Sequence, residues 1–152
     1  MPADLQAAVT ALGFDFGTQR IGVASGQSIS GSAQPLTVLK ARDGIPDWTQ
    51  IGTLIEQWQP GALVVGLPYN MDGSESELLL RAVKFGKRLH GRFGLPVFGL
   101  DERLSSRAAI EQVIEQQGPG KTTAIDHVAA QIILENWFAE LMRGRGREAA
   151  AT

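Results

Sequence analysis

The stretch ALGFDFGTQRIGVASG, residues 11–26, carries the pattern that predicts how the fold begins. Residues 11–16 are apolar apart from Asp15, and residues 20–25 form a second run suited to a strand. Because only the three residues GTQ separate the two runs, they predict an antiparallel β-hairpin. Asp15 interrupts the first run, and burying an unpaired carboxylate costs on the order of several kcal/mol. The sequence therefore requires something that compensates Asp15.

The rest of the chain alternates between strand and helix patterns. Further strands are expected at 34–40, 62–67 and 95–100, and helices are expected to begin near 47, 77, 105 and 123. The order β-β-β-α-β-α-β-α-α predicts an α/β fold with a mixed five-stranded sheet and helices on both faces. We expect one domain over residues 11–142, with flexible tails at 1–10 and 143–152.

The composition is that of an ordinary soluble globular domain, since 43% of the 152 residues are hydrophobic and 20% are charged. With a formal net charge of -2, binding to nucleic acid must come from local basic patches. The absence of cysteine excludes disulfides and thiolate metal ligands. No apolar run approaches the roughly 20 residues that span a bilayer, and residues 1–10 do not resemble a signal peptide. We therefore expect a cytoplasmic protein with no membrane partner.

Three acids, Asp15, Glu102 and Asp126, stand in surroundings that do not explain them. Asp126 shares a helical face with Ala130 and Ile133, which predicts that it points toward the sheet. Carboxylates that converge without histidine or cysteine favour Mg²⁺ or Mn²⁺, and two such ions about 3.5–4 Å apart can promote phosphodiester cleavage. The alternative is that the following turn hydrogen-bonds Asp15 and that solvent surrounds the other two acids. The spacing alone leaves both interpretations open.

Four motifs occur in order: FDFGTQRIGVA, VVGLPYNMDG, DERLSS and IDHVAAQIIL. Together, over residues 11–138, they closely resemble the YqgF/RuvX family of pre-16S rRNA nucleases, which are related to Holliday-junction resolvases and have an RNase H-like fold. The resemblance implies that Asp15, Glu102 and Asp126 bind Mg²⁺ or Mn²⁺ and are catalytic in a two-metal-ion mechanism. Asp101 is a further candidate metal ligand, but neighbouring side chains of a strand face opposite ways, so we favour Glu102.

Several other residues are candidates for binding substrate. Arg20 and Arg103 lie close in sequence to the acids and either clamp phosphates or form plain salt bridges. A basic stripe on the helix after residue 76 is either a nucleic-acid track or a solvated face. The full candidate set is Thr18, Arg20, Asn70, Arg103, Ser105, Ser106, Arg81, Lys84 and Arg88, with Lys87 and Arg92 on the same stripe.

The function that this resemblance implies is metal-dependent hydrolysis of structured RNA at the 5′ end of pre-16S rRNA, with the ribosomal precursor as partner. One alternative is a Holliday junction resolvase acting on branched DNA in recombination and repair, which would need a homodimer. Another is a non-catalytic module that binds RNA or the ribosome. The Asp-x-Gly-Thr turn also resembles the phosphate loops of actin-like ATPases, but those proteins hold nucleotide between two domains. The sequence leaves open whether the protein is a monomer or a homodimer.

Overall fold

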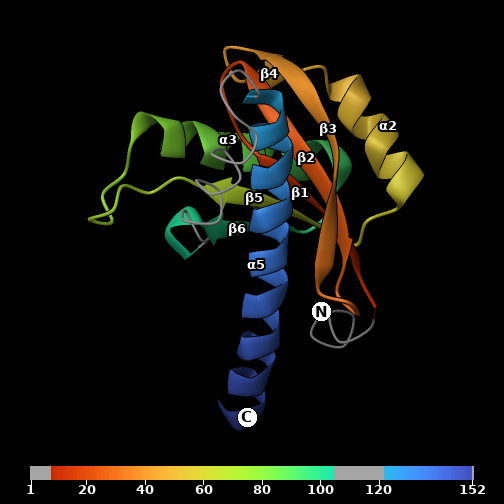
Figure 1. Ribbon diagram of the computed structural model, residues 1–152, viewed down its shortest axis with the longest axis vertical. Helices are drawn as coiled ribbons and strands as arrows, with labels where there is room; N and C mark the ends of the chain where they lie inside the picture. Colours follow the sequence, from red (N-terminus) through yellow and green to blue (C-terminus); the bar gives the residue numbers. More distant parts are fainter. Residues whose placement is uncertain (1–7, 105–121, 152) are drawn as a thin grey trace.

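The structure is a computed structural model that describes the backbone of residues 8–104 and 122–151 and the side chains of residues 8–103 and 128–143 (Figure 1). Its strands are β1 Thr10–Asp15, β2 Arg20–Gln27, β3 Ser32–Arg42, β4 Ile45–Pro46, β5 Ala62–Leu67 and β6 Val97–Asp101. Its helices are α2 Trp48–Trp58, α3 Glu77–Phe93 and α5 Thr122–Ala151, with the 3₁₀ turn η1 at Glu102–Leu104. None of the described helices is long and apolar enough to cross a membrane.

These strands form one mixed sheet in the order β4-β3-β2-β1-β5-β6. The predicted hairpin is confirmed, because β1 and β2 pair antiparallel from Thr10–Gln27 to Asp15–Gly22. Strand β1 also pairs parallel with β5, and β5 pairs parallel with β6. The carboxyl ends of β1, β5 and β6 therefore lie along one edge of the sheet, where side chains that follow these strands can meet.

The sheet has six strands in the described residues, so the expected number of five was wrong. The additional strand, β4, has two residues and pairs only with Ala41 and Arg42. Two residues are too few to produce an alternating pattern. The signal that could have revealed β4 is the pair Asp43-Gly44, since both residues have positive φ (51° and 81°), as a two-residue hairpin turn of this kind requires.

Two of the described elements extend past the ends of the expected domain, residues 11–142, whose bounds stay a prediction. Val9 donates its backbone N–H to Ser28 Oγ at 2.9 Å, and Thr10 already belongs to β1, so ordered pairing begins before residue 11. Helix α5 continues to Ala151 rather than ending at residue 142, through a stretch that ends in alanines, the strongest helix formers. The helix expected to begin near Ser105 or Ser106 lies outside the described residues.

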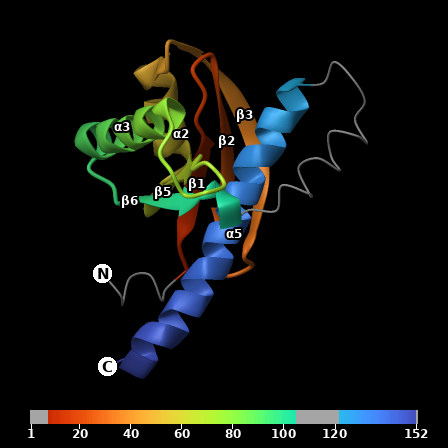
Figure 2. The same ribbon diagram turned by 90° about the vertical axis from the view of Figure 1, so that its left-hand side faces the viewer.

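Helices α2 and α3 cover one face of the sheet and α5 crosses the other (Figure 2). The core under α2 and α3 contains large side chains, among them Phe14, Phe16 and Phe85. The α5 face has small residues where the helix crosses β1. A Cβ atom on Gly13 would stand 3.1 Å from Leu134 Cβ and 3.2 Å from the Ala130 carbonyl oxygen, so Gly13 permits this close approach.

Candidate active site

Asp15 is the last residue of β1 and is half-buried, so it stands at the end of the strand and not inside it as expected. Leu12 and Phe14 belong to the core under α2 and α3, whereas Ala11 belongs to the core under α5. Because successive side chains of a strand alternate between faces, Asp15 lies on the α5 face. Its position at the strand end lowers the cost of keeping the carboxylate ionised.

Glu102 opens η1 directly after β6, and its carboxylate lies over the backbone of Gly66 in β5. A Cβ atom on Gly66 would stand 2.7 Å from Glu102 Oε1 and 2.5 Å from Ile133 Cδ1 of α5. The Glu102 carboxylate is therefore also on the α5 face, in space that is available only because Gly66 has no side chain.

The β1–β5 register brings these two acids to neighbouring positions. Phe14 pairs with Val65, so the next residues, Asp15 and Gly66, lie side by side on strands that are about 4.8 Å apart. Glu102 projects over Gly66 on the face that Asp15 also occupies. Asp15 and Glu102 thus lie at one corner of the sheet, although they are 87 positions apart in sequence, counted from 15 to 102.

The direction of α5 brings its beginning toward the same corner. A Cβ atom on Gly26, which pairs with Ala11 at the start of β1, would stand 2.8 Å from Phe138. Ala130 crosses Gly13 further along β1, so α5 runs antiparallel to β1. Asp126 lies one helical turn before Ala130, on the side of the strand end that carries Asp15. Its side chain lies outside the described residues, and among the described side chains no group of three His, Cys, Asp or Glu could hold a metal ion.

Asp101, the acid next to Glu102, contacts an arginine. Its Oδ1 and Oδ2 atoms accept from Arg103 Nε at 3.1 and 3.0 Å, and Oδ2 accepts from Arg103 Nη2 at 2.6 Å. This hydrogen bonding holds the pKa of Asp101 below its usual value and raises the pKa of Arg103. Asp101 follows Leu100, which packs under α5, so alternation directs it to the opposite face from Glu102. A metal-binding role for Asp101 stays a prediction.

The loop between β5 and α3 supports Arg103. The Arg103 guanidinium carbon lies 5.2 Å from the centre of the Tyr69 ring, and a Cβ atom on Gly73, which has a φ of 87°, would stand 3.1 Å from Arg103 Nη1. Asn70 donates to Ser74 Oγ at 3.0 Å within the same loop. Arg103 therefore forms the salt bridge that was the alternative to a phosphate clamp, and its partner is Asp101. No sequence pattern indicated that the Tyr69 ring would pack against Arg103.

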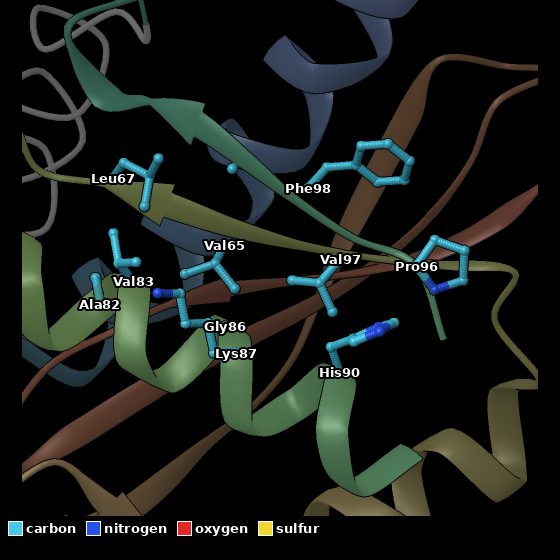
Figure 3. A pocket seen from close by; sticks show the side chains of 11 residues that line it. Val65, Leu67, Ala82, Val83, Gly86, Lys87, His90, Pro96, Val97 and Phe98 are labelled. Atoms are coloured by element: carbon cyan, nitrogen blue, oxygen red, sulfur yellow. The ribbon is translucent and has the colours of Figure 1, made fainter. Parts of the chain in front are cut away.

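The predicted basic stripe on α3 divides into three parts. Lys87 lines an apolar hollow of about 530 Å³ between α3 and strands β5 and β6, beside Val65 and Val97 (Figure 3). Arg92 lies over the Trp48 ring, with its guanidinium carbon 4.5 Å from the ring centre. The other three basic residues, Arg81, Lys84 and Arg88, line a separate hollow of about 200 Å³ between α3 and the β3–β4 turn.

The remaining candidates lie near the β1–β2 connection or outside the described residues. Thr18 is half-buried, and its carbonyl oxygen accepts from the Gly44 backbone N–H at 2.8 Å. Arg20 is exposed and begins β2, opposite Lys40 of β3. Ser105 and Ser106 lie outside the described residues.

Solved structures share this arrangement of strands and helices. The chain aligns with Thermus thermophilus RuvC in complex with a Holliday junction substrate at a TM-score of 0.52 and 15% identity, covering 88% of this chain and 96% of RuvC. It aligns with the yeast mitochondrial Holliday junction resolvase at a TM-score of 0.54 and 11% identity, covering 93% and 84%. These likenesses define the class of fold: it is the RNase H-like fold of the RuvC-type resolvases, as the resemblance implied.

The family follows from sequence similarity. A family model described as RuvX, Holliday junction resolvase, matches residues 9–140. A protein of Chromohalobacter salexigens is 58% identical over 131 residues, which are 85% of this chain and 88% of the relative, and one of Pseudomonas aeruginosa is 55% identical, covering 85% and 91%. Both are named "Putative pre-16S rRNA nuclease". The chain belongs to the RuvX family.

Proposed function

We propose that this protein is a metal-dependent nuclease that hydrolyses phosphodiester bonds in structured RNA and processes the 5′ end of pre-16S rRNA. The observation that carries the proposal is the placement of Asp15 and Glu102 side by side on the α5 face, at the carboxyl edge of the parallel strands. The names of the relatives support RNA as the substrate class. A protein acting on ribosomal precursors would work in the cytoplasm, which stays a prediction.

The acids at this corner fit a hard divalent cation, because carboxylate oxygens are the ligands that Mg²⁺ and Mn²⁺ prefer. Asp15 and Glu102 would hold the metal together with Asp126, and Asp101 is the reserve ligand. A bound cation pair supplies positive charge that stabilises the charge developing on the phosphoryl oxygens. The finer two-metal-ion mechanism is part of this proposal.

The protein's own contribution is to hold the carboxylates rigidly. A Cβ atom on Gly17 would stand 2.5 Å from the Arg20 carbonyl oxygen, so the connection after Asp15 is tight and needs glycine. The Glu102 carboxylate and the Ile133 side chain both lie against the backbone of Gly66. Ligands already held in place lose little freedom when metal and substrate bind. We assign Thr18, Arg20, Asn70 and Arg103 to contacts with the phosphates beside the cleaved bond, and Ser105 and Ser106 remain candidates for the same role.

The test is cleavage of three substrates with and without Mn²⁺: RNA carrying the 5′ leader of pre-16S rRNA, an unrelated structured RNA and a four-way DNA junction. We expect metal-dependent cleavage of the leader RNA that falls about 10³-fold or more in Asp15→Asn and Glu102→Gln, since several kcal/mol of charge stabilisation are lost. Asp47→Asn is the control, because Asp47 is an exposed helix cap on α2 and asparagine also caps helices. Cleavage by Asp15→Asn at the wild-type rate would contradict the proposal.

The free energy of unfolding of Asp15→Asn, measured in EDTA, distinguishes a metal ligand from a carboxylate that stabilises the fold. Without metal, two neighbouring carboxylates repel each other, so we expect the variant to be as stable as the wild type or more stable. A loss of about 2 kcal/mol or more would mean that Asp15 is hydrogen-bonded for the sake of the fold. That result would return Asp15 to its structural interpretation.

A Holliday junction resolvase is the second candidate, because the matching family model carries that description. Paired cuts across a four-way junction need two active sites and hence a homodimer. Sedimentation of the protein with the DNA junction distinguishes the candidates. A dimer that cuts the junction symmetrically favours the resolvase, whereas a monomer that cuts only RNA favours the rRNA nuclease. Tight RNA binding with no metal-dependent cleavage of any substrate would favour a non-catalytic module.

A further inference from the structure

The hollow between α3 and the β3–β4 turn gathers positive charge in one place. Arg81, Lys84 and Arg88 come from successive turns of α3, and all three line the hollow. The described residues that line it contain one acid, Asp43. Asp43 Oδ1 accepts from Arg81 Nη1 at 2.6 Å. Glu77, which does not line the hollow, lies one turn earlier on α3 and contacts Arg81 Nη2 at the longer distance of 3.4 Å. The hollow therefore holds three cations and an anion that contacts one of them.

The contact between Asp43 and Arg81 is easily replaced. The side chain of Asp43 is 77% exposed and that of Arg81 is 37% exposed. Exposed ion pairs contribute little to stability, because water and salt screen the two charges. A phosphate oxygen accepts from an arginine in the same geometry as a carboxylate, and it brings further oxygens for the two other cations. The Asp43 carboxylate thus occupies the position that one phosphate oxygen would take.

The hollow also lies at the edge of the sheet that carries the candidate active site. Phe16, which lines it, directly follows Asp15. Gly44 of the turn donates its backbone N–H to Thr18, in the connection that follows Asp15. Helix α3 begins after the loop that leaves the carboxyl end of β5. A nucleic-acid strand that crosses this edge of the sheet would contact Asp15 and Glu102 on the α5 face and the hollow on the α3 face.

We propose that this hollow is a phosphate-binding subsite for the nucleic-acid backbone that flanks the cleaved bond. In the free protein the Asp43 carboxylate is hydrogen-bonded to Arg81, and a phosphodiester displaces it on binding. The choice of nucleic acid as the ligand rests on the proposed nuclease function. The ability to bind phosphate rests on the three cations of the hollow alone. The turn keeps its shape when the charge is removed, because asparagine adopts a positive φ as readily as aspartate. Asp43→Asn is therefore a clean probe of the displacement.

The experiment measures binding of a labelled duplex RNA of about 16 base pairs, a length that covers two successive minor grooves, in EDTA, where no cleavage interferes. We expect Lys84→Ala and Arg88→Ala each to weaken binding about 3–10-fold and to reduce the salt slope by about one unit per lost phosphate contact. Lys87→Ala and Arg92→Ala are matched controls, since they remove the same charge from the same helix outside the hollow. Equal losses in all four variants would overturn the subsite.

The second arm tests the displacement of Asp43. Asp43→Asn should bind the RNA about 3–10-fold more tightly, because the phosphate no longer competes with the Asp43 carboxylate for Arg81 and meets only the longer contact of Glu77. Asp47→Asn removes the same charge elsewhere and should leave affinity within about twofold, since a distant exposed charge is screened. If both variants gain affinity equally, the effect is general electrostatics and the displacement is wrong. If inorganic phosphate at matched ionic strength competes as well as the RNA does, the assignment to a nucleic-acid backbone is wrong.

These outcomes are separate from those of the cleavage assay. A protein that cleaves RNA but shows no difference between Lys84→Ala and Lys87→Ala keeps its nuclease function and loses the subsite. A protein that cleaves nothing but shows the difference keeps the subsite and loses the nuclease function.

Discussion

The two faces of the sheet are packed with side chains of different size near the carboxyl end of β1. Under α2 and α3, the Phe85 ring lies 5.7 Å from Phe14, 5.3 Å from Phe16 and 5.8 Å from Trp48, measured between ring centres, so large aromatic side chains fill a thick layer. On the α5 face, glycines at positions 13 and 66 leave no such layer near the carboxyl end of β1. Both faces carry a buried core, but only the α5 face has glycines at the corner where Asp15 and Glu102 lie, so close approach there leaves room for carboxylates.

The largest effect on stability is expected on the face under α2 and α3, called the aromatic face below after its cluster of rings around Phe85. Phe85→Ala removes a fully buried ring that contacts three other rings, and it should lower the free energy of unfolding by about 3–5 kcal/mol. Urea unfolding measures this loss. Phe85→Leu should lose clearly less, because it retains part of the buried volume. Similar losses for both variants would show that ring contacts, and not filled volume, determine the stability of this face.

Gly66→Ala tests the α5 face and combines stability with activity. The new methyl group would stand 2.7 Å from Glu102 Oε1 and 2.5 Å from Ile133 Cδ1, so both side chains must move. We expect a loss of about 1–3 kcal/mol on unfolding and at least a tenfold loss of metal-dependent cleavage. Gly61→Ala is the control, because its nearest contact would be an ordinary 3.5 Å to Val9. Full activity in Gly66→Ala would mean that the position of Glu102 is not critical.

The salt bridge beside the acids should give a smaller, pH-dependent effect. Arg103 lowers the pKa of Asp101, so the folded state favours the ionised carboxyl. Its contribution is therefore present above the carboxyl's usual pKa and is lost as the pH falls through the lowered value. Asp101→Asn should cost about 1 kcal/mol at pH 7. Unfolding of both proteins across the acid range measures the difference, which should shrink as the pH falls. A difference that stays constant would contradict this account.

Gly86→Ala is expected to have the smallest effect and the opposite sign. Gly86 lies inside α3 on the aromatic face, where a Cβ atom would make ordinary contacts of 3.6 Å to Val97 and 3.8 Å to Val65. Alanine favours the helix by about 0.5–1 kcal/mol over glycine, so the variant should unfold at a slightly higher temperature. Thermal unfolding measures this. A loss of stability would show that the aromatic face also depends on close approach at its glycines.

Much of the fold was predictable because its signals are local. The β1–β2 hairpin follows from two runs separated by three residues, and β5 has the predicted bounds of 62–67. Helix α2 begins after Asp47, whose Oδ1 accepts from the Thr49 N–H at 2.9 Å. Strand β4 was missed because it exists only through pairing with the end of β3. A two-residue partner strand has no periodicity of its own to read.

The members of the candidate site could be proposed from the sequence, whereas its geometry could not. Asp15 and Glu102 were chosen from their unusual surroundings and from the family motifs, and the strand register explains how they become neighbours. The partners of Arg81 and Arg103 could not be chosen from the sequence, because Asp43 and Asp101 are two of several acids within reach. Only the folded chain decides which carboxylate meets which guanidinium.

The sequence by itself determined the class of fold and the family, and it nominated the residues of the candidate site, since these depend on local patterning and on motifs in a set order. The tertiary structure alone decided that Gly66 makes room for Glu102, that Asp101 and Glu102 have different partners, and that the basic stripe of α3 divides among two hollows and an indole ring. The physical reason is that contacts across a sheet depend on register and on the distance at which helices pack. Neither quantity is set by any single segment of the chain. The aspartate that interrupts residues 11–16 stands half-buried at the end of β1, and the register places it beside Glu102, 87 positions away, counted from 15 to 102.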